Sequence, residues 1–206
     1  MQFNDKRSME HIRQQLVFLS VSLSIREHTM TLAAETLIII EELDAIESKR
    51  FTFQEEATGA LALLHASVTD LQLVVASLAS HASMLDRLNP TLGLRTKLFP
   101  DGSSYIIRKS GTGIASVLDD LNRIVNILDV HRNLVGTQDL KGRLENSIDT
   151  VKARLDEYIM LNERVDIVLK DIDMFRKRTG DYFYEMEKSL KKIYGENKKI
   201  INSHFL

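Results

Sequence analysis

The stretch that decides the fold spans residues 144–200 and reads LENSIDTVKARLDEYIMLNERVDIVLKDIDMFRKRTGDYFYEMEKSLKKIYGENKKI. Seventeen of its positions, starting at Leu144, are separated alternately by four and three residues, and thirteen of these are apolar. This spacing is typical of a helix that packs along one seam, as in a coiled coil. The stretch therefore predicts one helix of about 60 residues, roughly 90 Å long at ~1.5 Å per residue.

The carboxy-terminal part of this helix is a candidate interaction seam. No other predicted helix is as long, so its end either packs against the first or second predicted helix of its own chain or pairs with another molecule. Association with a partner helix or a second copy of the chain is the simpler interpretation. Two asparagines interrupt the seam, and they are either tolerated near water or fix the register and number of partners. The seam comprises Asn162, Val165, Leu169, Ile172, Phe183, Met186, Leu190, Ile193, Asn197 and Ile200.

Turn-forming residues divide the rest of the chain. Both prolines and four of the nine glycines lie in 90–113, whereas the remainder is poor in such residues. We therefore predict an all-α fold, an elongated antiparallel bundle of two helical hairpins with about four helices. In this prediction 1–206 is a single domain, with one hairpin at 1–88, an insert at 89–113 and a second hairpin at 114–206 that has a coiled-coil carboxy-terminal half.

The first hairpin is predicted to contain helices at 9–46 and at 52–88. Asp5 or Ser8 is a candidate N-cap of the first, and the segment 17–25 also alternates with period two, so a strand is the alternative there. A break is expected at 48–51, because Thr52 and Glu55 have the spacing of a capping box. The second helix carries one charged residue between Ala57 and Leu85, which predicts a buried central helix.

The insert and the third helix follow from turn chemistry. Two short β-compatible runs, 97–99 and 105–107, flank Pro100, Asp101 and Gly102, so we expect a small β-hairpin or an ordered loop at about 94–109. A helix is predicted at 114–134, with His131 on its seam as a core or register residue and Gly136 after its end.

Composition limits the functions that the chain can have. Cysteine is absent, which excludes disulfides, thiolate metal sites and thiol catalysis. The formal net charge is −2, and this gives no general attraction to nucleic acid or to an anionic membrane. We expect no signal peptide and no conventional transmembrane anchor, because the longest stretches without a charged residue are 13 and 15 residues. A cytoplasmic location is the expectation.

The sequence contains few candidates for chemistry. No histidine has a glutamate three residues before it, and no His-Glu-x-x-His motif occurs. We therefore expect no metal, no cofactor and no enzymatic activity. We interpret His65 and His81 as ordinary, partly buried residues. A candidate anion contact lies at the start of the third helix, with a flexible entry to that helix as the plainer interpretation; it comprises Arg108, Lys109, Gly111, Thr112 and Gly113.

Two functions from different classes fit these observations. The first is a non-enzymatic scaffold or interaction protein that forms an oligomer or docks a partner through its long helices. The second is a membrane-active helical bundle, such as a subunit of an α-helical pore-forming toxin, that rearranges to expose the apolar helix at 52–88. From residue 176 onward eight basic residues are interspersed with four acidic ones and with aromatic residues, which favours a solvated face. A surface that docks a partner protein and a surface that binds nucleic acid or lipid are the alternatives, and we do not expect nucleic acid as a partner.

Overall fold

The computed structural model describes residues 8–195 and 197–205, and over these ranges the chain is helical and contains no strand. The predicted all-α bundle is confirmed. Residue contacts divide the chain into two compact units. Unit 1 comprises Met1–Gln54 and Glu163–Leu206, and unit 2 comprises Glu55–Asn162. This division differs from the predicted hairpins, and the elongated single domain stays a prediction.

Two long helices contribute to both units. Helix α2 spans Met30–Leu88 and helix α6 spans Thr137–Tyr194. The predicted break at 48–51 is therefore wrong, and the capping box is wrong with it. The Thr52 hydroxyl donates to the carbonyl oxygen of Ser48, four residues earlier, at 3.0 Å. A threonine inside a helix makes this bond, whereas an N-cap threonine accepts from a following backbone N–H.

The turn that does separate the first two helices lies at 25–29. Helix α1 spans Met9–Ser24, and the short 3-10 helix η1 spans Glu27–Thr29. The buried Thr29 hydroxyl donates to the carbonyl oxygens of Leu23, at 2.6 Å, and of Arg26, at 3.0 Å. The bond to Leu23 satisfies a carbonyl group that the end of α1 leaves without a helical partner. The turn contains neither glycine nor proline, so the sequence gives no conventional signal for it.

Helix α1 confirms helix, rather than strand, for the segment 17–25. Ser8 is its N-cap, because the Ser8 hydroxyl accepts a hydrogen bond from the backbone N–H of His11 at 3.2 Å. The alternative cap, Asp5, lies outside the described residues. The 3-4 spacing of apolar residues in the first predicted helix places nine residues on its core side. Met30 and Leu37 are exposed instead, because α1 ends before them and α2 begins at Met30. The other seven are buried as expected: Met9, Ile12, Leu16, Leu19, Leu23, Ala33 and Ile40.

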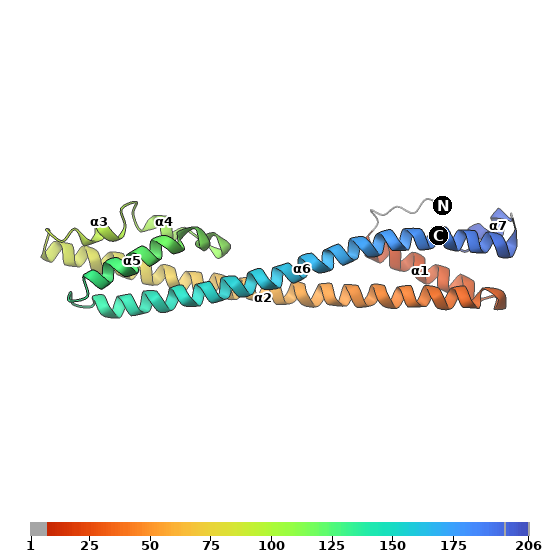
Figure 1. Cartoon of the computed structure of the whole chain (residues 1–206), viewed down its shortest axis with the longest axis horizontal. Coiled ribbons are helices and arrows are strands. Elements are labelled where there is room, and N and C mark those ends of the chain that lie inside the picture. The colour runs from red at the N-terminus through yellow and green to blue at the C-terminus, as the bar shows by residue number, and fades with distance from the viewer. Residues whose placement is uncertain (1–7, 196, 206) are drawn as a thin grey trace. The chain divides into compact units, whose positions relative to one another are not determined.

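Unit 1 is built from α1, the first part of α2, the last part of α6 and the short helix α7 (Lys198–Asn202). In Figure 1, α1 lies beside α2 and α6. One buried cluster joins Ile40 and Leu43 of α2 to Phe175 of α6, and a second joins Ala33 to Leu190. Earlier residues of α2 thus contact later residues of α6, so the two helices run antiparallel in this unit.

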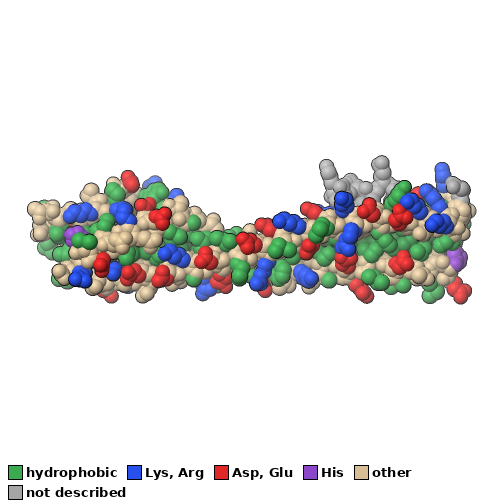
Figure 2. Space-filling view, viewed as in Figure 1, with side chains coloured by type: hydrophobic (Ala, Val, Ile, Leu, Met, Phe, Trp, Pro, Cys, Tyr) green, Lys and Arg blue, Asp and Glu red, His purple; other side chains and the backbone are tan. Residues whose placement is uncertain are grey.

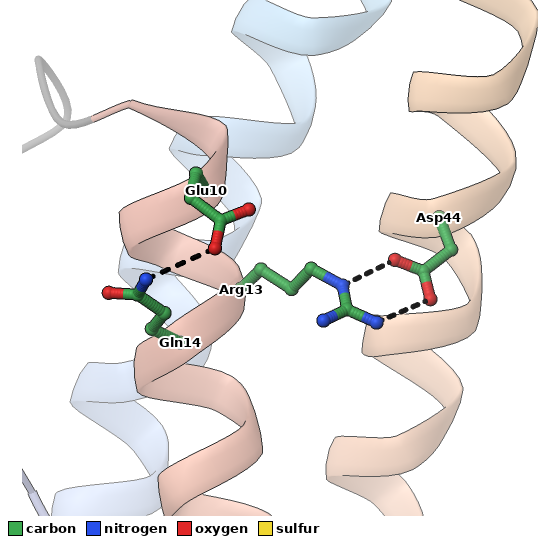
Figure 3. Close-up of polar contacts among 4 residues, drawn as sticks. All are labelled: Glu10, Arg13, Gln14 and Asp44. Carbon is green, nitrogen blue, oxygen red and sulfur yellow. Dashed lines mark hydrogen bonds and ion pairs between the residues drawn. The ribbon is translucent and has the colours of Figure 1, made fainter.

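Polar contacts add to the apolar core of unit 1. The guanidinium of Arg13 on α1 binds both carboxylate oxygens of Asp44 on α2, at 2.8 and 3.2 Å (Figure 3), and this hydrogen bond lowers the pKa of Asp44. The hydroxyl groups of Thr36 and Tyr182 share a hydrogen bond of 2.7 Å between α2 and α6. Burial raises the pKa of Tyr182 to about 12, so this phenol stays protonated.

Unit 2 places α5 (Leu118–Val130) against the last part of α2 and the first part of α6. One hydrophobic cluster runs through the unit and includes residues of every element in it. The apolar residues of α2 that are spaced by three and four are buried from Leu64 to Leu85. Those of the third predicted helix, which begins ahead of α5, are buried from Ile114 to Leu128. His131 lies at the end of α5, is half-buried, and caps the helix through its backbone N–H.

The segment 94–109 forms short helices, so the β-hairpin alternative is wrong. Helix α3 spans Leu94–Leu98, helix α4 spans Ser104–Ile107, and the 3-10 helix η2 follows at Gly111–Val117. The carboxylate of Asp86 accepts from the backbone N–H groups of Leu94 and Arg95, at 2.7 and 2.9 Å. Because a helix start leaves such donors free, Asp86 favours a helical turn over a strand.

Each of two histidines on α2 contacts a loop glycine. His65 lies against Gly111 and His81 against Gly136, and both glycines have positive φ, +50° and +75°. A Cβ at either glycine would lie 2.9 Å from the Cε1 atom of its histidine. A ring nitrogen of His81 also shares a hydrogen bond of 2.9 Å with the carbonyl oxygen of Val135. The two histidines therefore fix the loops at either end of η2 and α5.

We predict opposite effects for two glycine-to-alanine substitutions. Gly136→Ala should lower the free energy of unfolding by about 1–2 kcal/mol, because alanine is strained at positive φ and its Cβ meets His81. Gly142→Ala should raise it by about 1 kcal/mol, because Gly142 lies inside α6 and nothing approaches an added Cβ. Denaturant unfolding measures both; equal effects would contradict this assignment.

Candidate functional site

The candidate seam of α6 is divided between buried and exposed positions. Ile172, Met186 and Leu190 are buried, as predicted. Three further members are half-buried: Val165, Phe183 and Ile200. Four are exposed, which corrects their placement on the buried seam of this chain: Asn162, Leu169, Ile193 and Asn197. Asn197 instead caps α7, since its side chain accepts from the backbone N–H of Ile200 at 3.3 Å.

The residues of α6 that are buried in unit 1 differ from the predicted ones for a physical reason. In unit 1, Val168 and Phe175 are buried where the strict spacing predicted Leu169 and Arg176. The buried positions 168, 172, 175 and 179 keep the spacing by four and three residues, but two of them precede the predicted position by one residue. The buried face of α6 is therefore rotated around the helix axis relative to the prediction. This choice buries a phenylalanine in place of a guanidinium, which avoids the cost of taking a charge out of water.

The exposed side of α6 in unit 1 carries its own apolar residues. Ile167 is 57% exposed and Met174 is 58% exposed. They are seven residues apart and therefore lie on one face of the helix. We name the face formed by Glu163, Ile167, Lys170, Asp171, Met174 and Arg178 the α6 outer stripe. Sequence reasoning missed it because a solvent-exposed apolar pair has the same spacing as a buried one.

The candidate anion contact is only partly assembled. Arg108 and Lys109 line an open surface pocket of about 430 Å³ with Asp101, Ser104 and Tyr105. The Lys109 ammonium lies 5.1 Å from the centre of the Tyr105 ring. The other three predicted residues, Gly111, Thr112 and Gly113, do not line this pocket. Gly111 is buried against His65, so its backbone serves packing.

A cluster of aromatic and basic side chains closes the end of unit 1. The Tyr194 ring lies 5.1 Å from the Arg26 guanidinium carbon and stacks on the His204 ring, with centres 5.7 Å apart. His204 is 4% exposed, and its Nδ1 shares a hydrogen bond of 3.1 Å with the Ser22 hydroxyl. Among the described residues, Nε2 of His204 has no hydrogen-bond partner. Burial, and then the charge of Arg26, lower the pKa of His204.

We predict that this histidine makes unit 1 less stable in acid. Because the pKa of His204 is lower in the folded state, the unfolded chain binds the proton more readily below about pH 6.5. The free energy of unfolding should therefore fall as the pH decreases from about 7.5 to about 5.5, and His204→Gln should reduce this fall. Thermal unfolding at the two pH values measures it. His11→Gln, at an exposed position, is the control; an identical pH dependence in all three proteins would contradict the prediction.

Two further features of the described residues concern metal binding and membrane insertion. The described residues contain no group of three or more histidine, aspartate and glutamate side chains placed to hold a metal ion. One helical stretch, Glu27–Leu88, is long and apolar enough to cross a membrane: an 18-residue window has a mean hydropathy of 1.6, and 33% of it is buried. The sequence predicts no span when only stretches without any charged residue are considered, whereas a span can contain one or two such residues. A core helix of a soluble protein meets the same criteria.

Comparison with protein-family models, with curated proteins and with solved structures gives no match. We therefore infer the function from the all-α fold and its exposed surfaces.

Proposed function

We propose that the protein is a non-enzymatic helical scaffold or interaction protein that associates through α6. The observation that carries this proposal is the α6 outer stripe, on which two large apolar side chains are more than half exposed. Exposed apolar groups at helical spacing favour packing against another helix, because that contact removes them from water.

The residues of the α6 outer stripe are also complementary to themselves. If two copies of α6 pack antiparallel about a point between Lys170 and Asp171, Ile167 of one copy faces Met174 of the other. In the same register Lys170 faces Asp171, and Glu163 faces Arg178, which also pairs with Glu42 of its own chain. Apolar residues then meet apolar residues and each charge meets its opposite, as a two-fold symmetric interface requires. A second copy is therefore the partner that this surface fits best.

We predict that the solution mass depends on the α6 outer stripe. The wild type should be a dimer, and Ile167→Asp combined with Met174→Asp should shift it to the monomer, because four carboxylates would then face one another. Val130→Asp with Val135→Asp is the matched control, since these side chains are 79% and 84% exposed in unit 2. Asn162→Leu should leave the mass unchanged, because Asn162 lies on a different face of α6. Sedimentation equilibrium measures all four proteins.

Charge reversal tests the register of the same interface. Lys170→Glu should weaken the dimer modestly, since exposed ion pairs contribute at most about 1 kcal/mol each, and adding Asp171→Lys should restore it. A wild type that stays monomeric at high concentration, and binds no helical partner, would contradict the proposed function.

A second candidate function rests on the hydropathy of α2. The apolar stretch that meets the length and hydropathy criteria for a membrane span favours a membrane-active bundle that rearranges to expose α2. We predict that such a protein releases a trapped dye from lipid vesicles, and that Val75→Asp, which places a charge on the buried seam of α2, abolishes release. Intact vesicles over a range of pH and lipid composition would exclude this candidate.

A further inference from the structure

A second exposed apolar face lies on α1, away from the α6 outer stripe. Phe18, Val21 and Ile25 are spaced by three and four residues and therefore share one face, on which Ile25 is 77% exposed. Twelve consecutive residues, from Gln14 to Ile25, contain no charge. From Val17 to Ile25 the exposed side of this segment thus consists of apolar side chains and serines alone. We name the face formed by Phe18, Val21 and Ile25 the α1 stripe.

Helix α7 fixes a group of lysines beside the α1 stripe. Ser22, the residue after Val21, contacts His204, and Ile201 is buried in the same cluster as Leu19 and Leu23. Lys198 and Lys199 on α7 are exposed, and among the described residues neither has a carboxylate within ion-pair distance. Figure 2 shows basic side chains gathered over the end of α6 and α7.

This end of unit 1 carries an excess of positive charge although the whole chain is slightly negative. Residues 185–205 contain five lysines and three glutamates. Lys188 and Lys191 pair with glutamates of α6, so the positive charge that is not compensated there lies on Lys192, Lys198 and Lys199. Arg26 adds a positive charge at the end of the α1 stripe, next to the exposed Glu27. Apolar side chains bordered by unpaired lysines are the combination that binds the interface of an anionic bilayer: the apolar groups enter the headgroup region and the lysines attract the lipid phosphates and carboxylates.

We propose that the α1 stripe and the lysines of α7 form a docking surface for an anionic membrane. The contact is peripheral, so it requires no rearrangement of the helical core and is independent of the self-association of α6. A bilayer fits better than a folded protein because the α1 stripe offers no directional hydrogen-bonding group besides serine hydroxyls, and Ser22 and Ser24 already donate to carbonyl oxygens of α1.

Vesicle flotation tests the proposal with the full chain. The wild type should bind vesicles of phosphatidylcholine with phosphatidylserine and not vesicles of phosphatidylcholine alone. Val21→Asp with Ile25→Asp should abolish binding, and Lys198→Glu with Lys199→Glu should weaken it by about 25-fold or more, at about fivefold per lysine. Val130→Asp with Val135→Asp, which alters equally exposed residues of unit 2, should bind as the wild type does.

The position of the bilayer can be read from a single fluorophore. The chain contains no tryptophan, so Val21→Trp introduces the only indole. Its emission should shift to shorter wavelength when phosphatidylserine-containing vesicles are added, whereas the emission of Val130→Trp should not. The shift reports burial of the α1 stripe even where binding is too weak for flotation.

Several outcomes would overturn the proposal. These are equal binding to both kinds of vesicle, binding that survives both the aspartate and the glutamate pairs, or an unshifted emission of Val21→Trp. Binding to polyglutamate or to DNA without binding to vesicles would assign the lysines to another class of partner and overturn it as well. Since every substituted side chain is exposed, circular dichroism of each variant should match the wild type, and loss of self-association alone would leave vesicle binding intact.

Discussion

The apolar stripe on α2 is the contact on which the other helices depend. In unit 1 it presents Ala33, Ile40 and Leu43 to α1 and α6, and in unit 2 it presents residues from Leu64 to Leu85 to α5 and α6. Long helices in water derive most of their stability from packing of such a stripe and less from intrinsic propensity. Because α2 contributes to both units, α1 and α5 each pack against the same helix, and the faces they turn outward become the surfaces available to partners.

The sequence was sufficient where the period of apolar residues alone determines structure. It predicted the all-α fold, the buried positions of α1 and the seam of α2 in unit 2. It was wrong where one side chain decides the end of a helix. The turn at 25–29 depends on the hydroxyl of Thr29, and the capping-box pattern at Thr52 and Glu55 occurs inside a helix. A four-residue pattern cannot distinguish these cases, because the backbone partners available to each hydroxyl differ only in the folded chain.

The candidate sites also depend on contacts between residues that are far apart in the sequence. Arg108 and Lys109 are neighbours in sequence and line one pocket, whereas Gly111 packs against His65, which lies far away in the sequence. The helical turn at Leu94 depends on Asp86 in the preceding helix, so the local β-compatible runs were misleading. On α6, spacing predicted a seam but could not choose between adjacent residues. The preference for burying Phe175 over Arg176 follows only once the neighbouring helices are in place.

Backbone amide exchange measured by NMR across residues 46–57 shows whether α2 is one helix, because this is where the sequence suggested a break and the structure has an uninterrupted helix. We expect helical Cα chemical shifts throughout the segment and amide protection that continues without a gap from Ile46 to Ala57. Coil-like shifts and unprotected amides at 48–51 would mean that α2 is two helices, and that no single helix contributes to the cores of both units.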